Sequence, residues 1–485
     1  MNWPGFVALA PLVVVAAAAL LVPLLISIRR SHALAAGTAF VGFVAGAAVI
    51  PWSLAVAPLQ VTPLLIVDAY ALFYIGLVFL SSAVVVLLSH GYLARREVER
   101  QEELYILLLL AGIGAAVLAA SSHFASFFLG LETLSVSLYA LVAFTRKRAG
   151  SIEAGIKYLI LAAATSAVLL LGMAYVYADL GVMGFEALGT ALAAGAGGPV
   201  ALVGLVLMLV AVGFKLALVP FHMWVPDVYV GAPAPIAGFL ATASKGGVVA
   251  VSLRLLVEHE GYRDTAVFTA LAAMAVLSIL LGNVLALLQP NLKRLLAFSS
   301  IAHMGYLLVA LLAVGAFAVE AVTFYLVAYF VTTLGAFGVI GSLVRDGGEE
   351  ADRVEHLRGL YWRRPALAAL MTVCLLSLAG MPLTAGFIAK FTVLAAGVAA
   401  ASWLLVWTMI AGSAIGIFYY MRVIVTMVSE PADDAGLESG PGTLRTGVAL
   451  SAAAGLAVLF VLVVVFGVYP GPVQALIEAA VQGLF

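Results

Sequence analysis

Apolar runs of about 20 residues or more follow one another almost without interruption from Phe6 to Tyr469. A bilayer core is crossed by roughly 20 consecutive apolar residues in a helix, so each run predicts a membrane-spanning helix. The chain is 65% hydrophobic and only 10% charged, which excludes a water-soluble globular protein. We therefore predict an all-α polytopic membrane protein without a sizeable water-soluble domain.

Polar residues, prolines and glycines divide the apolar sequence into about fourteen predicted spans. The spans are 6–28, 33–57, 70–90, 104–122, 123–144, 153–178, 200–230, 235–257, 265–288, 294–314, 317–344, 364–400, 403–428 and 444–469. The first run is longer than the apolar part of a signal peptide and no positive residue precedes it, so we expect it to be retained.

The seventh and twelfth spans are too long for one straight helix and contain helix breakers. Interruptions are predicted at Pro220 and Pro226 in the seventh span. In the twelfth they are predicted at Gly380, Pro382 and Gly386. Both spans are therefore expected to be broken helices. The segments around 180–200 and 430–443 are read as loops without a recognisable role.

Lysine and arginine collect in alternate loops between the spans, and such residues are enriched in loops that stay cytoplasmic. The loops after even-numbered spans contain only Arg263, so both termini are predicted to face away from the cytoplasm. The cations after odd-numbered spans are Arg29, Arg30, Arg95, Arg96, Arg100, Arg146, Lys147, Arg148, Lys293, Arg294, Arg345, Arg353, Arg358, Arg363 and Arg364.

The two broken spans are five helices apart, which suggests two structural repeats of five helices each. Because five is odd, spans 4–8 and 9–13 would have opposite orientations in the membrane. The predicted parts are residues 1–103 (helices 1–3), 104–257 (first repeat), 258–429 (second, inverted repeat) and 430–485 (a loop and helix 14). Inverted repeats with a broken helix at the same position indicate a transport path near the midplane of the membrane.

Several ionisable residues lie inside the predicted spans, where a charge costs at least ~2.5 kcal/mol. Lys215 precedes the break at Pro220, Lys245 lies some ten residues from either end of its span, and Glu132 is near the middle of the fifth. Lys157 lies about one turn into its span, so its long side chain could instead reach the interface. Lys245 could not reach water without a cavity.

These residue types suit proton transfer. Burial disfavours the charged form of a lysine and a nearby carboxylate restores it, so making or breaking a Glu–Lys pair switches a lysine between holding and releasing a proton. His303, near the centre of the tenth span, favours a relay role. For His222, at or beyond the break in the seventh span, a relay role and a satisfied interfacial histidine are equally consistent with the sequence.

Other classes of site are not indicated. Cys374 is the single cysteine, so this chain cannot supply a disulfide framework or a thiolate-held iron–sulfur or zinc site. No Gly-rich nucleotide loop is present, and the formal net charge of -1 gives no sign of a nucleic-acid partner. We expect no cofactor or metal in this chain.

Three stretches carry a family resemblance: "FKLALVPFHMWVPDVYVGAPAPIAGFLATASKGG", "LKRLLAFSSIAHMGYLLVAL" and "GLYWRRPALAALMTVCLLSLAGMPLTAGFIAKF". They resemble the antiporter-like membrane subunits of respiratory complex I and of Mrp-type cation/proton antiporters. "PFHxWxPD" is typical of the wider superfamily, whereas the run from "RGLYWRRP" to "SLAGMPLTAGFIAKF" is similar to the subunit N family of bacterial NADH:quinone oxidoreductase. The resemblance covers essentially the whole chain.

The resemblance implies a site. The family's glutamate in the fifth helix falls on Glu132, and its lysines in helices six, seven and eight fall on Lys157, Lys215 and Lys245. The charged residue of the broken twelfth helix falls on Lys390, which argues against the middle antiporter-like subunit, where a glutamate occurs. His303 and His222 are added to this relay from the sequence itself.

The resemblance also implies a function: a proton-translocating subunit of a translocase in the bacterial cytoplasmic membrane, with no redox site of its own. NADH, FMN, iron–sulfur clusters and quinone would belong to partner subunits. Other membrane-arm subunits, including a neighbouring antiporter-like subunit and small membrane subunits, would be the partners. The hypothesis is that a proton enters from the cytoplasm near Lys215 and Lys245, passes His303 and leaves past Lys390, with Glu132–Lys215 pairing setting the timing.

Two alternatives remain. A cation/proton antiporter subunit of Mrp type would share the superfamily motifs and the buried charges. A structural scaffold that has lost its pump would share the fold, but it would have no reason to keep four lysines and a glutamate within the spans together with two broken helices.

Overall fold

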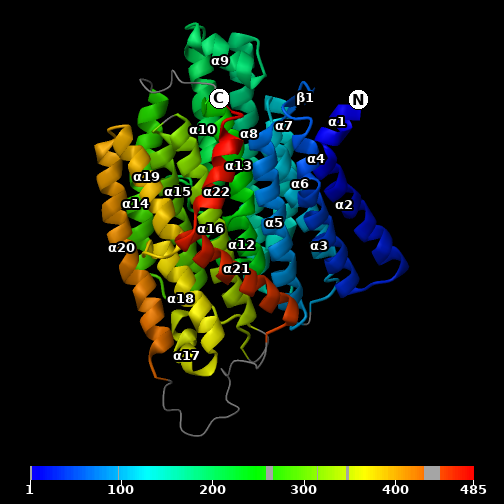
Figure 1. The fold of residues 1–485 in the computed structure, drawn as a ribbon, viewed down its shortest axis with the longest axis vertical. Helices are drawn as coiled ribbons and strands as arrows, with labels where there is room; N and C mark the ends of the chain where they lie inside the picture. The colour runs from blue at the N-terminus through cyan, green and yellow to red at the C-terminus, as the bar shows by residue number, and fades with distance from the viewer. Residues whose placement is uncertain are drawn as a thin grey trace.

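Long helices that run side by side make up nearly the whole structure, a computed structural model that describes residues 3–96, 98–257, 266–313, 315–345, 349–430 and 448–484 (Figure 1). The N-terminal part contains α1 (Trp3–Ala8), α2 (Ala10–Ile28), α3 (His32–Ala48), α4 (Ile50–Leu54) and α5 (Ala69–Leu93). A short antiparallel hairpin of β1 (Leu59–Thr62) and β2 (Leu65–Val67) precedes α5.

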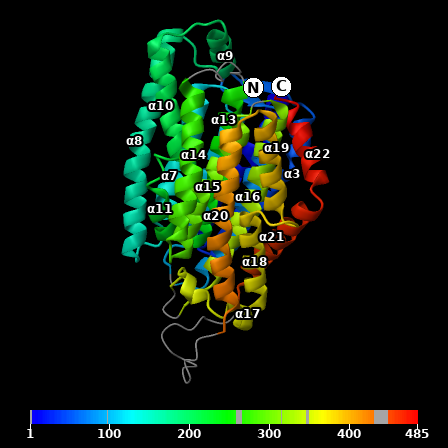
Figure 2. The ribbon, with the colours of Figure 1, turned by 90° about the vertical axis from the view of Figure 1, so that its left-hand side faces the viewer.

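The next helices form the first predicted repeat. They are α6 (Glu103–Ala120), α7 (Phe124–Val142), α8 (Ala149–Leu180), α9 (Phe185–Ala193), α10 (Pro199–Leu216), α11 (Val225–Gly231), α12 (Ala234–Ala241) and α13 (Ala243–Val257). The long α8 packs beside α10 at one edge of the bundle, with the short α9 between them in sequence (Figure 2).

The remaining helices cover the second predicted repeat and the C-terminal part. They are α14 (Ala266–Leu287), α15 (Leu292–Leu311), α16 (Ala316–Ser342), the 3-10 turn η2 (Val354–Leu357), α17 (Leu360–Arg363), α18 (Pro365–Ala379), α19 (Ala385–Ala399), α20 (Trp403–Val428), α21 (Leu450–Val468) and α22 (Gly471–Val481).

The predicted all-α membrane fold is confirmed. Within the described ranges, thirteen helical segments are long and apolar enough to cross a membrane, counting α3–α4 and α12–α13 each as one segment. The predicted twelfth span is the shorter pair α18 and α19, which brings the structure into agreement with about fourteen predicted spans. The division into repeats stays a prediction, although α10–α11 and α18–α19 are both broken where expected.

Several local expectations were wrong. Pro226 does not interrupt a helix, because it lies in the first turn of α11, where its missing N–H breaks no hydrogen bond. Gly386 likewise lies inside the first turn of α19. The segment 180–200 contains α9, and an unexpected break at Thr242 separates α12 from α13. Arg263 and positions 431–443 of the predicted loop lie outside the described residues.

Both termini lie near the same end of the bundle as α9, whereas α17, in the Arg-rich segment after α16, lies at the opposite end (Figure 1). The centre of the bundle is formed by α12–α13, α15 and α16, whose most apolar stretches are almost completely buried, in contrast to α2, α8 and α21. Because these central helices are shielded by others, they can carry polar side chains without exposing them to lipid.

Close packing of α6 on α7 depends on Gly114. A Cβ atom there would lie 2.5 Å from the backbone nitrogen of Leu134 and 2.8 Å from the carbonyl oxygen of Gly130. Both neighbours are backbone atoms, so neither helix could relieve the contact by rotating a side chain.

We expect Gly114→Ala to destabilise the protein by about 1–3 kcal/mol, the usual cost of overpacking. Gly37→Ala is the matched control, because Gly37 is also helical and a Cβ there would meet no atom within 4 Å. Thermal denaturation of the detergent-solubilised protein should show a lower melting temperature for Gly114→Ala only. Equal melting temperatures would show that α6 and α7 do not require this close approach.

Candidate functional site

Lys215 lies in the last turn of α10, directly before the first helix break. Ala217 adopts a left-handed conformation (φ 64°), and the chain then reaches Pro220, which cannot continue a helix. The buried Lys215 ammonium donates a hydrogen bond of 2.6 Å to Ser135 Oγ of α7. A cation at the C-terminal end of a helix is also favoured by the free carbonyl groups there.

Glu132 lies one turn before Ser135 on α7. Its Oε1 accepts a hydrogen bond from Ser166 Oγ of α8. Among the described residues, no ion pair within 4.0 Å joins Glu132 to Lys215. Each of the two predicted partners is therefore bonded to a serine, Glu132 to Ser166 and Lys215 to Ser135, and the expected direct pair is not formed in this structure.

Lys157 is placed differently from the other candidates. Its side chain is 45% exposed and forms ion pairs with Glu153 (2.7 Å) and Asp227 (3.0 Å). Asp227 also pairs with Arg294 at 3.0 Å. Lys157 thus joins a surface cluster, while its neighbour Tyr158 is buried and has its ring centroid 5.6 Å from Lys215 Nζ.

Lys245 is fully buried just after the break at Thr242. Its ammonium donates a hydrogen bond of 2.7 Å to Ser300 Oγ on α15. Ser300 Oγ also accepts a hydrogen bond of 2.8 Å from the hydroxyl of Tyr329 on α16. Lys245, Ser300 and Tyr329 therefore form one continuous polar chain across three central helices.

His303 lies one turn beyond Ser300 on α15 and is also buried. Its Nδ1 is 2.6 Å from the hydroxyl of Tyr325, and its Nε2 is 3.3 Å from the hydroxyl of Tyr420. The rings of His303 and Tyr329 have centroids 5.3 Å apart. The histidine therefore lies beside the polar chain that begins at Lys245.

Lys390 belongs to the second broken helix. From α19 its ammonium donates a hydrogen bond of 3.0 Å to the carbonyl oxygen of Ala379, at the C-terminal end of α18. Gly380 follows with φ 83°, and a Cβ on it would lie 2.7 Å from Lys390 Cδ. The break thus provides both a free carbonyl for the cation and the space for its side chain.

A small cavity lies between His303 and Lys390, the candidate residues of the second predicted repeat. It is lined by His303, Tyr325, Tyr329, Ser377 and Lys390 and has a volume of about 10 Å³, close to the minimum for one water molecule. A single water here would face hydroxyl, imidazole and ammonium groups at once. His303 and Lys390 therefore share one cavity, and Lys245 is connected to it through Ser300 and Tyr329.

His222 lies in the break between α10 and α11 and is nearly buried. Among the described residues, no hydrogen bond to its Nδ1 is found. The structure does not bring His222 into hydrogen-bonding contact with the lysines. A relay role and a role as a satisfied interfacial histidine both remain consistent with its position.

The sequence analysis missed the hydroxyl groups that connect the charges. Ser135 and Ser300 are ordinary residues of an apolar helix by composition, and only their spacing of one turn from Glu132 and His303, respectively, could have indicated them. Tyr325 and Tyr329 lie on another helix, α16, and no spacing along the sequence links them to His303. It also missed that Lys293, assigned to a loop, is completely buried. Two buried ion pairs were not foreseen: Asp68–Arg254 and Lys293–Glu350.

Comparisons with known proteins identify the family of the chain. Residues 121–416 match the family described as "NADH:quinone oxidoreductase/Mrp antiporter, TM". NADH-quinone oxidoreductase subunit N of Methylococcus capsulatus is 48% identical over 99% of this chain and 95% of its own length. Subunit N of Ectopseudomonas mendocina is also 48% identical, over 98% and 96%. The chain belongs to this family.

Solved structures support the same membership. A chain of respiratory complex I from Thermus thermophilus is 31% identical, with 97% of this chain and 99% of that chain covered and a TM-score of 0.80. A chain of the Mrp complex from Dietzia has a TM-score of 0.85 over 100% and 98%, but it is only 20% identical and shares the fold alone. The antiporter-like fold predicted from the sequence is thereby confirmed.

We expect Gly380→Ala to destabilise the second break, because the added methyl group meets Lys390 as well as the left-handed backbone. Gly181→Ala is the matched control: Gly181 also ends a helix with φ 71°, but nothing lies within 4 Å of its Cβ position. The backbone cost of roughly 1 kcal/mol is common to both variants. Thermal denaturation should show the larger loss for Gly380→Ala, and equal losses would contradict a packing contact with Lys390.

Proposed function

We propose that this chain is a proton-translocating membrane subunit of an NADH:quinone oxidoreductase, of the subunit N type. The observation that carries the proposal is the continuous set of buried groups from Lys245 through Ser300 and Tyr329 to the cavity shared by His303 and Lys390. Ionisable side chains in the middle of a membrane protein are costly and mark ion paths by default.

The hydroxyl groups suit such a path because each can donate one hydrogen bond and accept another. A proton released by Lys245 would pass to Ser300 and, after the two hydroxyl groups rotate so that Ser300 donates to Tyr329, on to Tyr329. His303 and the cavity would then carry it towards Lys390. The ammonium of Lys390 rests on the carbonyl of Ala379, so it is held at the break rather than in hydrocarbon. Each step uses groups already within hydrogen-bonding distance or beside the cavity.

Residues of the first predicted repeat would control when the lysines take up protons. Glu132 and Lys215 are each bonded to a serine, with one turn of α7 between Glu132 and Ser135. Exchanging these serine contacts for a direct pair would favour the charged lysine, and separating them again would favour proton release. Lys157 and His222 are included in the relay on the family resemblance and the sequence, respectively.

The setting of the subunit follows from its relatives and its charges. Their names imply a complex that oxidises NADH and reduces quinone, so NADH, FMN, iron–sulfur clusters and quinone would be bound by partner subunits. Neighbouring membrane-arm subunits, including another antiporter-like subunit, would transmit the free energy of the redox reaction to this chain. The Arg- and Lys-rich loops would face the cytoplasm and both termini the periplasm of the bacterial inner membrane.

The test replaces Lys215 or Lys245 by Ala in the complete complex, assembled in membrane vesicles. We expect normal assembly but a large loss of NADH-driven acidification, because removing the amine deletes a proton carrier. Lys147→Ala is the control, since that lysine is 74% exposed at the surface. Acidification and NADH oxidation are measured together.

Unchanged acidification per NADH in both assembled variants would exclude the relay and favour a structural scaffold. Proton movement that depends on a sodium gradient and not on NADH would instead indicate an antiporter of Mrp type.

A further inference from the structure

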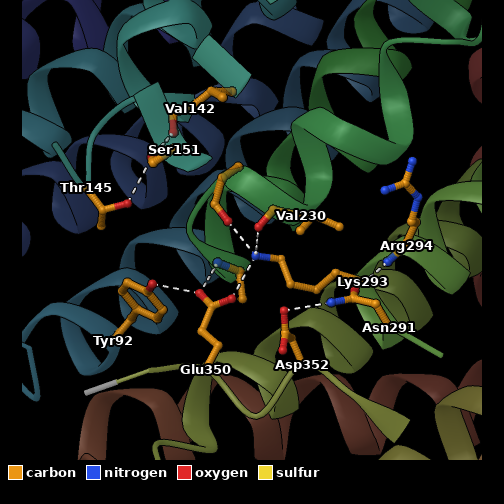
Figure 3. Close-up of polar contacts among 12 residues, drawn as sticks. Tyr92, Val142, Thr145, Ser151, Val230, Asn291, Lys293, Arg294, Glu350 and Asp352 are labelled. Carbon is orange, nitrogen blue, oxygen red and sulfur yellow. Dashed lines mark hydrogen bonds and ion pairs between the residues drawn. The ribbon is translucent and has the colours of Figure 1, made fainter. Parts of the chain in front are cut away.

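A buried ion pair joins Lys293 to Glu350, which lies in the segment that also contains Arg345 and Arg353 (Figure 3). The charged atoms are 2.7 Å apart and the two side chains are 0% and 1% exposed. Lys293 begins α15, and Glu350 lies in the segment between α16 and η2. Neither residue belongs to the relay described above.

The pair is attached to the turn between α11 and α12. Lys293 Nζ donates to the carbonyl oxygens of Val230 (2.9 Å) and Ala232 (2.6 Å) as well as to Glu350. These three bonds use all the donors of an ammonium group. The other oxygen of Glu350 accepts hydrogen bonds from the backbone N–H of Ala234 (3.1 Å), the first residue of α12, and from the hydroxyl of Tyr92 on α5 (2.7 Å).

The same turn leads to Lys245 by two routes. Along the backbone, α12 starts at Ala234, and Lys245 follows eleven residues later in α13, beyond the break at Thr242. Through side chains, Tyr229 precedes Val230 and places its hydroxyl 3.5 Å from Ser300 Oγ, which holds Lys245.

On α15, Ser300 follows Lys293 by seven residues and therefore lies on the same face, two turns deeper. A single helix face thus carries both the ion pair and the hydrogen-bond partner of Lys245.

Two surface clefts approach the pair from the outside. One, of about 760 Å³, is lined by Tyr92 together with arginines that include Arg96 and Arg148. The other, of about 270 Å³, is lined by Val230 and Asp352. Tyr92 bonds to Glu350 and Val230 bonds to Lys293, so each cleft ends at a direct partner of the pair. The pair therefore lies between these clefts and the interior that contains Lys245.

The surroundings of Glu350 favour its charged form in this closed arrangement. Burial opposes ionisation of Glu350, but the nearby Lys293 and Arg96 outweigh it and lower the pKa of this carboxyl to about 2. If the partners separated, each charge would be left without its counter-charge in a dry site, a state that requires water. Water entering there would come from the clefts.

We infer that the Lys293–Glu350 pair is a positioning element that closes the cytoplasmic approach to Lys245, and that this approach opens when the pair separates. Its role in pumping rests on the proposed function. Closure determines whether water can reach Lys245 from the cytoplasmic side. This access can be measured in a complex that does not pump protons.

The experiment measures access to position 245 with a thiol. Lys245→Cys is introduced together with Cys374→Ala, so that the chain contains one thiol, and the full complex is prepared in vesicles with the cytoplasmic face outward. A water-soluble, membrane-impermeant thiol reagent is added, and the labelling rate is compared with and without Glu350→Gln. We expect an increase of at least about tenfold, because removing one partner of a buried pair is strongly destabilising to the closed state.

Asp352→Asn is the matched control. Asp352 lies two residues from Glu350 and accepts a hydrogen bond of 2.7 Å from Asn291 (Figure 3), and among the described residues no ion pair within 4.0 Å joins it to Lys293. It should leave the labelling rate unchanged. An unchanged rate in Glu350→Gln, or an equal rise in both variants, would overturn the inference.

If Glu350→Gln prevents assembly, Glu350→Asp replaces it. This variant keeps the charge but shortens the side chain by one methylene, so the salt bridge is weakened and an intermediate rise in labelling is expected. A rate equal to that of Asp352→Asn would again reject the closure. Because Lys245→Cys removes the relay lysine in every sample, the result is independent of whether this subunit pumps protons.

Discussion

The structure depends on one constraint: a polar group inside a bilayer must find a partner within the protein. Unbroken helices meet this requirement for their own backbone. The two broken helices do not, and each has a lysine at the break. Lys390 binds the free carbonyl of Ala379, and Lys215 lies in the last turn before Ala217. The breaks and the lysines therefore occur together. The free backbone groups of a broken helix and a buried lysine are each unfavourable without a polar partner inside the protein.

The same constraint explains why the central helices contain so many hydroxyl groups. Lys245 and Lys215 are each bonded to a serine and not to a carboxylate. A permanent ion pair would fix a lysine in its charged form, whereas a neutral hydroxyl leaves both protonation states accessible and can relay a proton. Under the proposed function, a serine partner would leave Lys215 and Lys245 free to change protonation, and Glu132 is likewise bonded to a serine, Ser166.

The sequence predicted the helices, both breaks and the buried charges, because hydropathy, Pro220 and the Gly380–Pro382 segment act locally. It could not predict partners that come from distant segments. Lys293 was assigned to a loop because it lies at the start of a span. No residue near Lys293 in the sequence indicates that Glu350 is its partner. For Lys157 the sequence left two placements open, inside the relay or reaching the interface, because α8 is apolar around much of its circumference and does not indicate which side faces the core.

The eighth predicted span, α12–α13, combines these principles. At its start the backbone N–H of Ala234 is bonded to Glu350 of the Lys293–Glu350 pair, and near its end Arg254 forms two hydrogen bonds with Asp68, at 2.7 and 3.0 Å. Buried ion pairs are rigid because losing one partner leaves an unpaired charge. Between these fixed ends lie the break at Thr242 and Lys245, whose hydrogen bond is to a neutral serine. The helix is thus held by ion pairs near its two ends, whereas its middle, at Thr242 and Lys245, is not. A displacement of either end would therefore be transmitted to Lys245.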